Sequence, residues 1–215
     1  IEKSADYTAR NIRHESGITH FEFWGGEERL CDIRLRVFGR HNVYNALAAA
    51  AAASVCGIAP DAIEIALANF VGTKRRMERK GMLNGAVVYD DYGHHPVEIS
   101  ATLSGAREMG YQRILCAYQP HTYSRTAKLF DEFVEAFHCA DRVYFADIYA
   151  AREQNTFGVN SAGPAQAIGS EAEYCGSFSN VAKALTRDAK QGDLIIVMGA
   201  GDIYKVYDLL ELQNF

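Results

Sequence analysis

The sequence predicts an α/β protein whose main part is a doubly wound, mostly parallel sheet, preceded by a smaller α+β segment. Two observations carry this prediction. From about residue 86 onward, short apolar runs alternate with stretches of helical periodicity, which is typical of strands covered by helices on both faces. Before residue 57, two alternating runs are followed by an alanine-rich run, which indicates strands and then a helix.

The first part of the chain is expected to form hairpins at the rim of a larger sheet. Residues 19–24 alternate apolar and polar side chains, Gly25-Gly26 makes a turn, and residues 30–38 alternate again. Residues 42–56 contain seven alanines, and alanine is the best helix former. The sequence therefore predicts strands up to about residue 40 and a helix after them.

A second helix and a linker follow. Gly57 ends the first helix, and Pro60 suits the first turn of the next one, with Ile63, Leu67 and Phe70 on one face. Residues 71–79 are interpreted as a linker that carries a cluster of basic side chains: Lys74, Arg75, Arg76, Arg79 and Lys80.

The remaining elements alternate regularly. Strands are expected at residues 86–90, 114–118, 142–146, near 174, and at 194–198. Helices are expected from residue 96, with Ile99, Leu103 and Ala106 inward, then over 126–138, over 179–190 and from about 202. The stretch between the third strand and residue 174 is expected to be a loop.

Composition excludes several classes of protein. A hydrophobic fraction of 48% with 23% charged residues is ordinary for a soluble protein, and a net charge of -5 gives no reason to expect a nucleic-acid partner. No apolar run is long enough to span a membrane. Five scattered cysteines without a CxxC pair favour a reducing, cytoplasmic location. The absence of an initiator Met before Ile1 leads us to expect a piece of a longer protein.

Candidate sites are expected where parallel strands end, because ligands of such sheets bind beyond the carboxyl ends of the strands. The first candidate is the run Asp90-Asp91-Tyr92-Gly93-His94-His95-Pro96, which leads into a helix N-terminus that favours anions. An Asp there can accept hydrogen bonds from ribose hydroxyls. The pair of histidines lacks the spacing of a zinc site.

A second strand end carries Gln119-Pro120-His121-Thr122-Tyr123-Ser124-Arg125-Thr126. Arg125 would suit bidentate capture of a carboxylate or phosphate. The alternative is that Thr126 caps the helix and Arg125 is solvated.

Two further runs have competing interpretations. Arginines of the basic linker either reach an ATP phosphate or form a solvated charge run. The third strand end, Gly199-Ala200-Gly201-Asp202, lacks the third glycine of a dinucleotide loop and is interpreted as a tight turn.

The helix that follows the first strands opens with polar residues. His41 and Asn45 are four residues apart and share one face, where they could contact a flat heterocycle such as adenine. The alternative is that His41 or Asn42 caps this helix and that Asn45 is solvated.

Six segments in this order resemble the Mur ligase family: GRHNVYNALAA, GTKRRME, DDYGHHPVEI, YQPHTYSRT, ADIYAARE and MGAGDIYK. The resemblance runs from about residue 36 to 210. It implies that residues 1–74 are the end of a central ATPase domain and that residues 75–215 form a Rossmann-like carboxy-terminal domain. The phosphate-loop pattern G-x-x-x-x-G-K-[ST] does not occur in these 215 residues.

The resemblance also implies an activity. Its closest members are ATP-dependent ligases of peptidoglycan synthesis that join L-alanine to UDP-N-acetylmuramate through an acyl phosphate, with ATP and Mg²⁺. The isolated chain is expected to be inactive, with most magnesium ligands upstream of it. Alternatives are a ligase that recycles tripeptide onto the same nucleotide sugar, and a non-catalytic nucleotide-binding module.

Residue roles follow from the matched motifs. Those implied to bind the nucleotide are His41, Asn45 and Asp91, and either Arg75 or Arg76 matches the arginine that approaches the ATP phosphates. Those implied to act on or bind the other substrates are Tyr92, His94 and Arg125. Many members carry Arg where this chain has Thr122, which departs from the family pattern.

Overall fold

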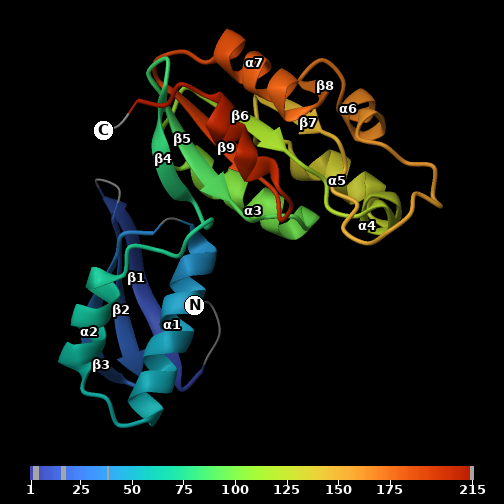
Figure 1. Ribbon diagram of the computed structural model, residues 1–215. Helices are drawn as coiled ribbons and strands as arrows, with labels where there is room; N and C mark the ends of the chain where they lie inside the picture. The colour runs from blue at the N-terminus through green and yellow to red at the C-terminus, as the bar shows by residue number, and fades with distance from the viewer. Residues whose placement is uncertain (2–4, 16–17, 38, 214–215) are drawn as a thin grey trace. The chain divides into compact units, whose positions relative to one another are not determined.

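The computed structural model describes residues 1, 5–15, 18–37 and 39–213. The chain divides into two units, Ile1–Gly72 (unit 1) and Thr73–Phe215 (unit 2). Figure 1 shows a small sheet with two helices in unit 1 and a larger layered structure in unit 2.

Unit 1 is an antiparallel sheet with two helices packed on one face. Its strands, in the order β1-β2-β3, and its helices are β1 (Tyr7–Glu15), β2 (Ile18–Gly25), β3 (Glu28–Leu35), α1 (Arg40–Val55) and α2 (Pro60–Asn69). Alternate residues of the strands, such as Phe23 and Ile33, are buried against Val43 and Ala50 of α1. This is the period-two pattern of a sheet with one wet face.

Two details of unit 1 differ from expectation. Among the described residues the three strands pair only with one another, in a three-stranded sheet separate from the six-stranded one. Helix α2 ends at Asn69, and Phe70 is extended and 42% exposed, so it does not share the buried face with Ile63.

Unit 2 is built on a six-stranded sheet of order β4-β5-β9-β6-β7-β8, which confirms the mostly parallel α/β fold. The strands are β4 (Glu78–Leu83), β5 (Ala86–Asp91), β6 (Arg113–Tyr118), β7 (Arg142–Ala146), β8 (Ala172–Gly176) and β9 (Asp193–Met198). All pairs are parallel except β4 with β5. The central strands are buried along almost their whole length, as strands covered on both faces must be.

Helices cover both faces of this sheet (Figure 1). One face packs against α3 (Pro96–Arg107), α5 (Phe130–Ala136) and α6 (Ala162–Ile168). The other packs against α7 (Phe178–Asp188) and the 3₁₀ helix η1 (Ile203–Leu209). The short helix α4 (Tyr123–Lys128) precedes α5. No helix in the described part of the chain is long and apolar enough to cross a membrane.

Three elements of unit 2 correct the expectations from sequence. The end of the predicted linker is part of β4, which includes Arg79 and Lys80. The helix expected over residues 126–138 is broken at Leu129 into α4 and α5. The predicted loop contains α6, with Pro164 near its start.

Candidate functional site

Four chain segments meet at the carboxyl edge of the unit 2 sheet, because β5, β9, β6 and β7 are neighbours and parallel. Backbone hydrogen bonds join the segments one to the next. The amide of Gly199 donates to the carbonyl of Asp91 (3.1 Å), and the amide of Thr122 donates to the carbonyl of Tyr149 (2.9 Å). The topology therefore brings together the strand ends that the sequence singled out.

The glycine-containing segment after β9 packs closely on Gln119. The Gln119 side chain donates to Asp202 Oδ1 (3.1 Å) and accepts from the amide of Ile203 (3.0 Å). A Cβ on Gly201 would lie 2.4 Å from Gln119 Oε1, and a Cβ on Gly199 would lie 2.9 Å from the Gln119 carbonyl oxygen. Close packing thus accounts for both glycines, and the segment is a tight turn.

Aromatic and basic side chains gather over this edge. We call Tyr92, His94, His121, Arg125 and Tyr149 the carboxyl-edge cluster. The rings of His94 and His121 have centroids 5.7 Å apart, and His121 stacks on Tyr149 at 5.4 Å. Tyr92 contacts His94 edge-on at 5.6 Å. Residues from β5, β6 and β7 segments therefore share one surface.

The two histidines of the cluster present opposite hydrogen-bonding groups. His94 Nδ1 lies 3.1 Å from the carbonyl oxygen of Tyr92, so it donates and leaves Nε2 of the neutral ring as an acceptor. His121 Nδ1 lies 3.3 Å from Arg125 Nη1, which can only donate, so Nδ1 accepts and Nε2 carries the proton. Burial, with the nearby positive charge of Arg125, lowers the pKa of His121.

Arg125 is held at the start of α4. Thr122 is the N-cap, with its hydroxyl accepting from the Arg125 amide (3.4 Å), so Thr126 is not the cap. Thr126 is buried and donates to the carbonyl of Thr122 (2.8 Å). Among the described residues, Nη1 of Arg125 finds protein acceptors while its Nε and Nη2 have none.

The adjacent carboxylates Asp90 and Asp91 are both buried, at 2% and 3% exposure. Asp91 accepts from the amides of Gly93 (2.8 Å) and Met77 (3.0 Å). Burial raises the pKa of both carboxyls, and these amide bonds partly offset the effect at Asp91. The N-terminus of α3, where an anion was expected, is occupied by Glu98, which accepts from the amides of His94 and His95.

The two candidate arginines of the linker differ in environment. Arg75 is enclosed: its Nη2 donates to the carbonyl of Gly199 (2.6 Å), and its Nε lies 3.4 Å from Asp90 Oδ2. Arg76 has 51% of its side chain exposed and reaches Glu98 at 3.7 Å. Of the two arginines, Arg76 therefore has the more accessible guanidinium.

The nucleotide-binding candidates of unit 1 lie at the start of α1. The helix begins after Gly39, which has φ +90° and is the N-cap, so neither His41 nor Asn42 caps it. Asn45 is exposed, and its amide donates to Asn42 Oδ1 (3.3 Å). A Cβ on Gly39 would lie 2.7 Å from Cε1 of the His41 ring, so the ring packs against this glycine.

Sequence reasoning did not single out three residues that the fold brings to the carboxyl edge: Tyr149, Glu153 and Tyr204. These three, like His121, lie in segments that resemble the Mur ligase family, but the sequence alone assigns them no role. Ser124 donates to Glu153 from both its amide (2.8 Å) and its hydroxyl. The sequence does offer one indication for Tyr149 and Glu153, because both follow the end of a strand, as Tyr92 and Arg125 do. Across the described residues, no group of three or more His, Cys, Asp or Glu side chains could hold a metal ion.

Comparison with known proteins agrees with this architecture. Residues 75–201 match the model of the Mur ligase glutamate ligase domain, and residues 1–53 match that of the Mur ligase middle domain. A UDP-N-acetylmuramate–L-alanine ligase of Lachnospira eligens is 47% identical over 95% of this chain. The match covers 46% of that relative, so the chain spans about half the length of the curated relatives it matches.

Two solved structures have the same fold over most of the chain. The UDP-N-acetylmuramate–alanine ligase of Thermotoga maritima superposes with a TM-score of 0.76 at 25% identity, covering 96% of this chain and 45% of that one. A murein peptide ligase of Psychrobacter arcticus superposes with a TM-score of 0.65 at 25% identity, covering 97% and 44%. With a family model matching more than half of its residues, the chain belongs to the Mur ligase family.

Proposed function

We propose that the full-length protein containing this chain is an ATP-dependent ligase that joins L-alanine to UDP-N-acetylmuramate in peptidoglycan synthesis. The observation that carries the proposal is the 47% identity, over 95% of the chain, to a relative of that name. The carboxyl-edge cluster supports it, since a guanidinium beside two imidazoles suits the carboxylate and amine of an amino acid.

Each group in the cluster has a specific task in this proposal. Arg125 binds the alanine carboxylate through Nε and Nη2, the nitrogens without protein acceptors in the described structure. His94 accepts a proton from the alanine ammonium at Nε2, which frees the amine to attack the carbonyl carbon of the muramyl acyl phosphate; the C–O bond to phosphate breaks and inorganic phosphate leaves. Tyr92 lines the same surface beside His94.

The nucleotide contacts are proposed from both units. Arg76 approaches the ATP phosphates, because it is the more exposed of the two linker arginines. Asp91 accepts from a ribose hydroxyl, since each of its oxygens keeps a second lone pair beyond its amide bond. His41 and Asn45 contact adenine.

The domain assignment and the magnesium site belong to the same proposal. Residues 1–74 would be the end of the central ATPase domain and residues 75–215 the carboxy-terminal domain, in line with the two family models. Mg²⁺ would be held mostly by residues outside this chain. The 215 residues contain no phosphate-loop pattern, and we expect the isolated chain not to form an amide bond.

The test is ligase activity of the full-length protein with ATP, Mg²⁺ and UDP-N-acetylmuramate, offering L-alanine and tripeptide in parallel. We expect alanine-dependent phosphate release that Asp91→Asn and Arg125→Met lower by at least about tenfold, the usual loss for a direct charged contact. The matched controls are Asp208→Asn and Arg107→Met, which lie outside the cluster and should keep full activity. Absence of turnover with either acceptor would contradict the proposal.

A tripeptide-recycling ligase is the second candidate. The fold shared with the murein peptide ligase favours it, but the superposition is weaker than with the alanine ligase, at a TM-score of 0.65 against 0.76. Turnover with tripeptide and none with L-alanine would select this candidate. A non-catalytic nucleotide module would instead show ATP binding by the 215-residue chain alone and no ligation by the full-length protein.

A further inference from the structure

The guanidinium of Arg75 is enclosed by three side chains and one backbone carbonyl of unit 2. Its Cζ lies 4.9 Å from the ring centroid of Tyr92 and 5.2 Å from that of Tyr204. Nη2 donates to the carbonyl of Gly199 at 2.6 Å, and Nε faces the buried carboxylate of Asp90 at 3.4 Å. A cation held by two rings, a carbonyl and a carboxylate is strongly fixed.

The backbone around Arg75 is fixed by the same part of the fold. The Arg75 amide donates to Glu78 Oε2 (2.9 Å), and the Met77 amide donates to Asp91 Oδ2 (3.0 Å). Arg75 and Met77 both have left-handed backbone angles, φ +57° and +47°, which non-glycine residues adopt only where the surroundings impose them. Arg76 lies between two residues that are each bound to unit 2.

A hydrogen-bonded turn precedes and includes Arg75, because the amide of Arg76 donates to the carbonyl of Thr73 at 3.2 Å. Lys74 and Thr73 are exposed, and Gly72, with φ +98°, ends unit 1. At the start of unit 2 the exposed Lys74 therefore comes directly before the enclosed Arg75 and the half-exposed Arg76.

From this arrangement we propose that Arg75 is a positioning residue: it fastens the start of unit 2 to the segments after β5 and β9 and thereby holds Arg76 and Asp91 in place. Arg75 itself does not touch substrate. Its effect on Arg76 and Asp91 deepens the proposed ligase function and rests on it, whereas the fastening itself is a property of the chain alone.

Neighbouring groups support a role in holding the backbone and not in binding phosphate. The positive charge of Arg75 is already opposed by Asp90, which is only 2% exposed, and the carbonyl of Gly199 takes its shortest hydrogen bond. A phosphate would have to displace these partners. The guanidinium of Arg76 is half exposed and more loosely held, by an ion pair with Glu98 at 3.7 Å and by the Tyr92 ring at 5.6 Å.

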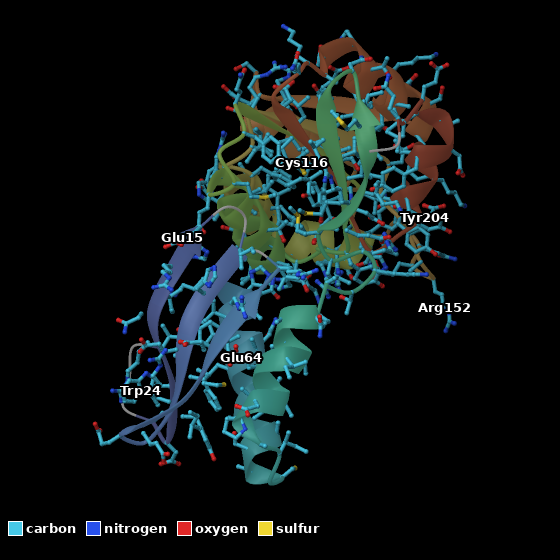
Figure 2. The ribbon with its side chains drawn as sticks, turned by 90° about the vertical axis from the view of Figure 1, so that its left-hand side faces the viewer. Glu15, Trp24, Glu64, Cys116, Arg152 and Tyr204 are labelled. Carbon is cyan, nitrogen blue, oxygen red and sulfur yellow. The ribbon has the colours of Figure 1, made fainter. Side chains whose placement is uncertain are left out.

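Tyr204 offers a way to loosen Arg75 without disturbing the core. Its ring is 45% exposed at the surface of unit 2 and is labelled in Figure 2. Tyr204→Leu removes one of the two rings that enclose the guanidinium, and Tyr204→Phe keeps that ring and serves as the matched control.

The first measurement is limited trypsin digestion of the 215-residue chain, followed by mass spectrometry. Trypsin cleaves after Lys and Arg, so Lys74, Arg75 and Arg76 report on consecutive positions of one segment. We expect cleavage after Arg75 and Arg76 to be slow in the wild-type chain, because the backbone around them is held. Tyr204→Leu should raise cleavage after Arg75 and Arg76 by at least about tenfold, while Tyr204→Phe leaves both rates unchanged.

The second measurement is kinetic and uses the full-length protein. Arg75→Met should lower kcat about tenfold when Arg76 is present and by clearly less in an Arg76→Met background, because the anchor then has only Asp91 left to position. Equal reductions in both backgrounds would assign Arg75 a direct contact and overturn the positioning role.

The two measurements separate the possible failures. If the wild-type protein forms no amide bond, the ligase proposal fails, and the digestion still decides whether Arg75 is fastened. If Tyr204→Leu leaves cleavage after Arg75 and Arg76 unchanged, the fastening is wrong whatever the ligase assay shows.

Discussion

At the scale of single residues, the carboxyl-edge cluster depends on which nitrogen of each histidine carries a proton. His121 accepts from Arg125 at Nδ1, while His94 donates from Nδ1 to the Tyr92 carbonyl. A proton added to His121 would enter at Nδ1, where it would face a guanidinium that has nothing to accept it. The neutral form of His121 is therefore the one that holds Arg125, and this has a measurable consequence.

We expect the pKa of His121 in the folded chain to lie below the ordinary value of 6.5. Arg125→Met should raise it toward that value, since the nearby cation disfavours the charged ring. The unfolded chain then binds a proton more readily, so His121 costs stability as the pH falls below 6.5, and stability is regained as the pH rises. An NMR titration of the ring resonances checks this. A pKa at or above 6.5 in the wild-type chain would contradict it.

A second prediction at this scale concerns Gly201. A Cβ there would lie 2.4 Å from Gln119 Oε1 and 2.7 Å from Tyr149 Cγ, and Gln119 is too deeply buried to move aside. Gly201→Ala should therefore lower the free energy of unfolding of unit 2 by about 1–3 kcal/mol, the usual range for overpacking. Urea denaturation measures the change. Gly163→Ala, inside α6, is the milder comparison and should cost less than Gly201→Ala, because its Cβ would meet Phe130 Cε2 at 3.3 Å and alanine favours a helix.

At the scale of elements, sequence periodicity located most of the parallel strands and the helix α3, because buried apolar runs dominate there. It missed β4, whose Glu78–Leu83 sequence carries charges and Gly81 at the sheet edge. It also missed α6, since a Gly-Pro pair is typical of loops. The break at Leu129 was hidden because apolar spacing continues across it. These elements are set by tertiary packing, which a local pattern does not record.

The segment after β7 is fastened to α4 mainly through Glu153. Both of its oxygens accept from Ser124, and these hydrogen bonds lower the pKa of the Glu153 carboxyl. The stabilisation is thus present above the unfolded pKa of about 4.5 and is lost as the pH falls through the lower, folded value. Glu153→Ala should speed hydrogen exchange of the Ser124 amide at pH 7 by about tenfold or more.

The control for this prediction is the neighbouring Arg152→Ala. Arg152 is exposed and extends away from unit 2 in Figure 2, so its loss should leave the exchange of Ser124 unchanged. If both variants speed exchange equally, the segment is held by its backbone and not by the Glu153 carboxylate.

At the scale of the whole molecule, the sequence predicts where the candidate site lies better than it predicts which residues contact one another there. Strand ends at Asp91 and Tyr118 were identified from apolar runs, and the rule for parallel sheets then pointed to their shared edge. The contact between Arg75 and Gly199 joins positions 124 residues apart, and it requires β9 to lie beside β5. Strand order of this kind is decided by the whole fold, so no local pattern predicts the contact.

The last prediction concerns the independence of the two units. Their buried clusters share no residue: Phe23 belongs to the core of unit 1, and Phe145 belongs to that of unit 2. Phe23→Ala should lower the stability of unit 1 by about 3–5 kcal/mol, the usual cost of emptying such a site, and leave unit 2 unchanged. The single tryptophan, Trp24, lies in unit 1, so its fluorescence follows that unit alone.

Hydrogen exchange followed by mass spectrometry reports on unit 2 in the same samples. Phe145→Ala should lower the protection of the β6 and β9 amides against exchange and leave the unfolding transition followed by Trp24 fluorescence unchanged. If instead either substitution moves both transitions together, the chain unfolds as one cooperative body. Separate transitions would mean that the connection between the units at Gly72 transmits little stability, so that each unit is held by its own core.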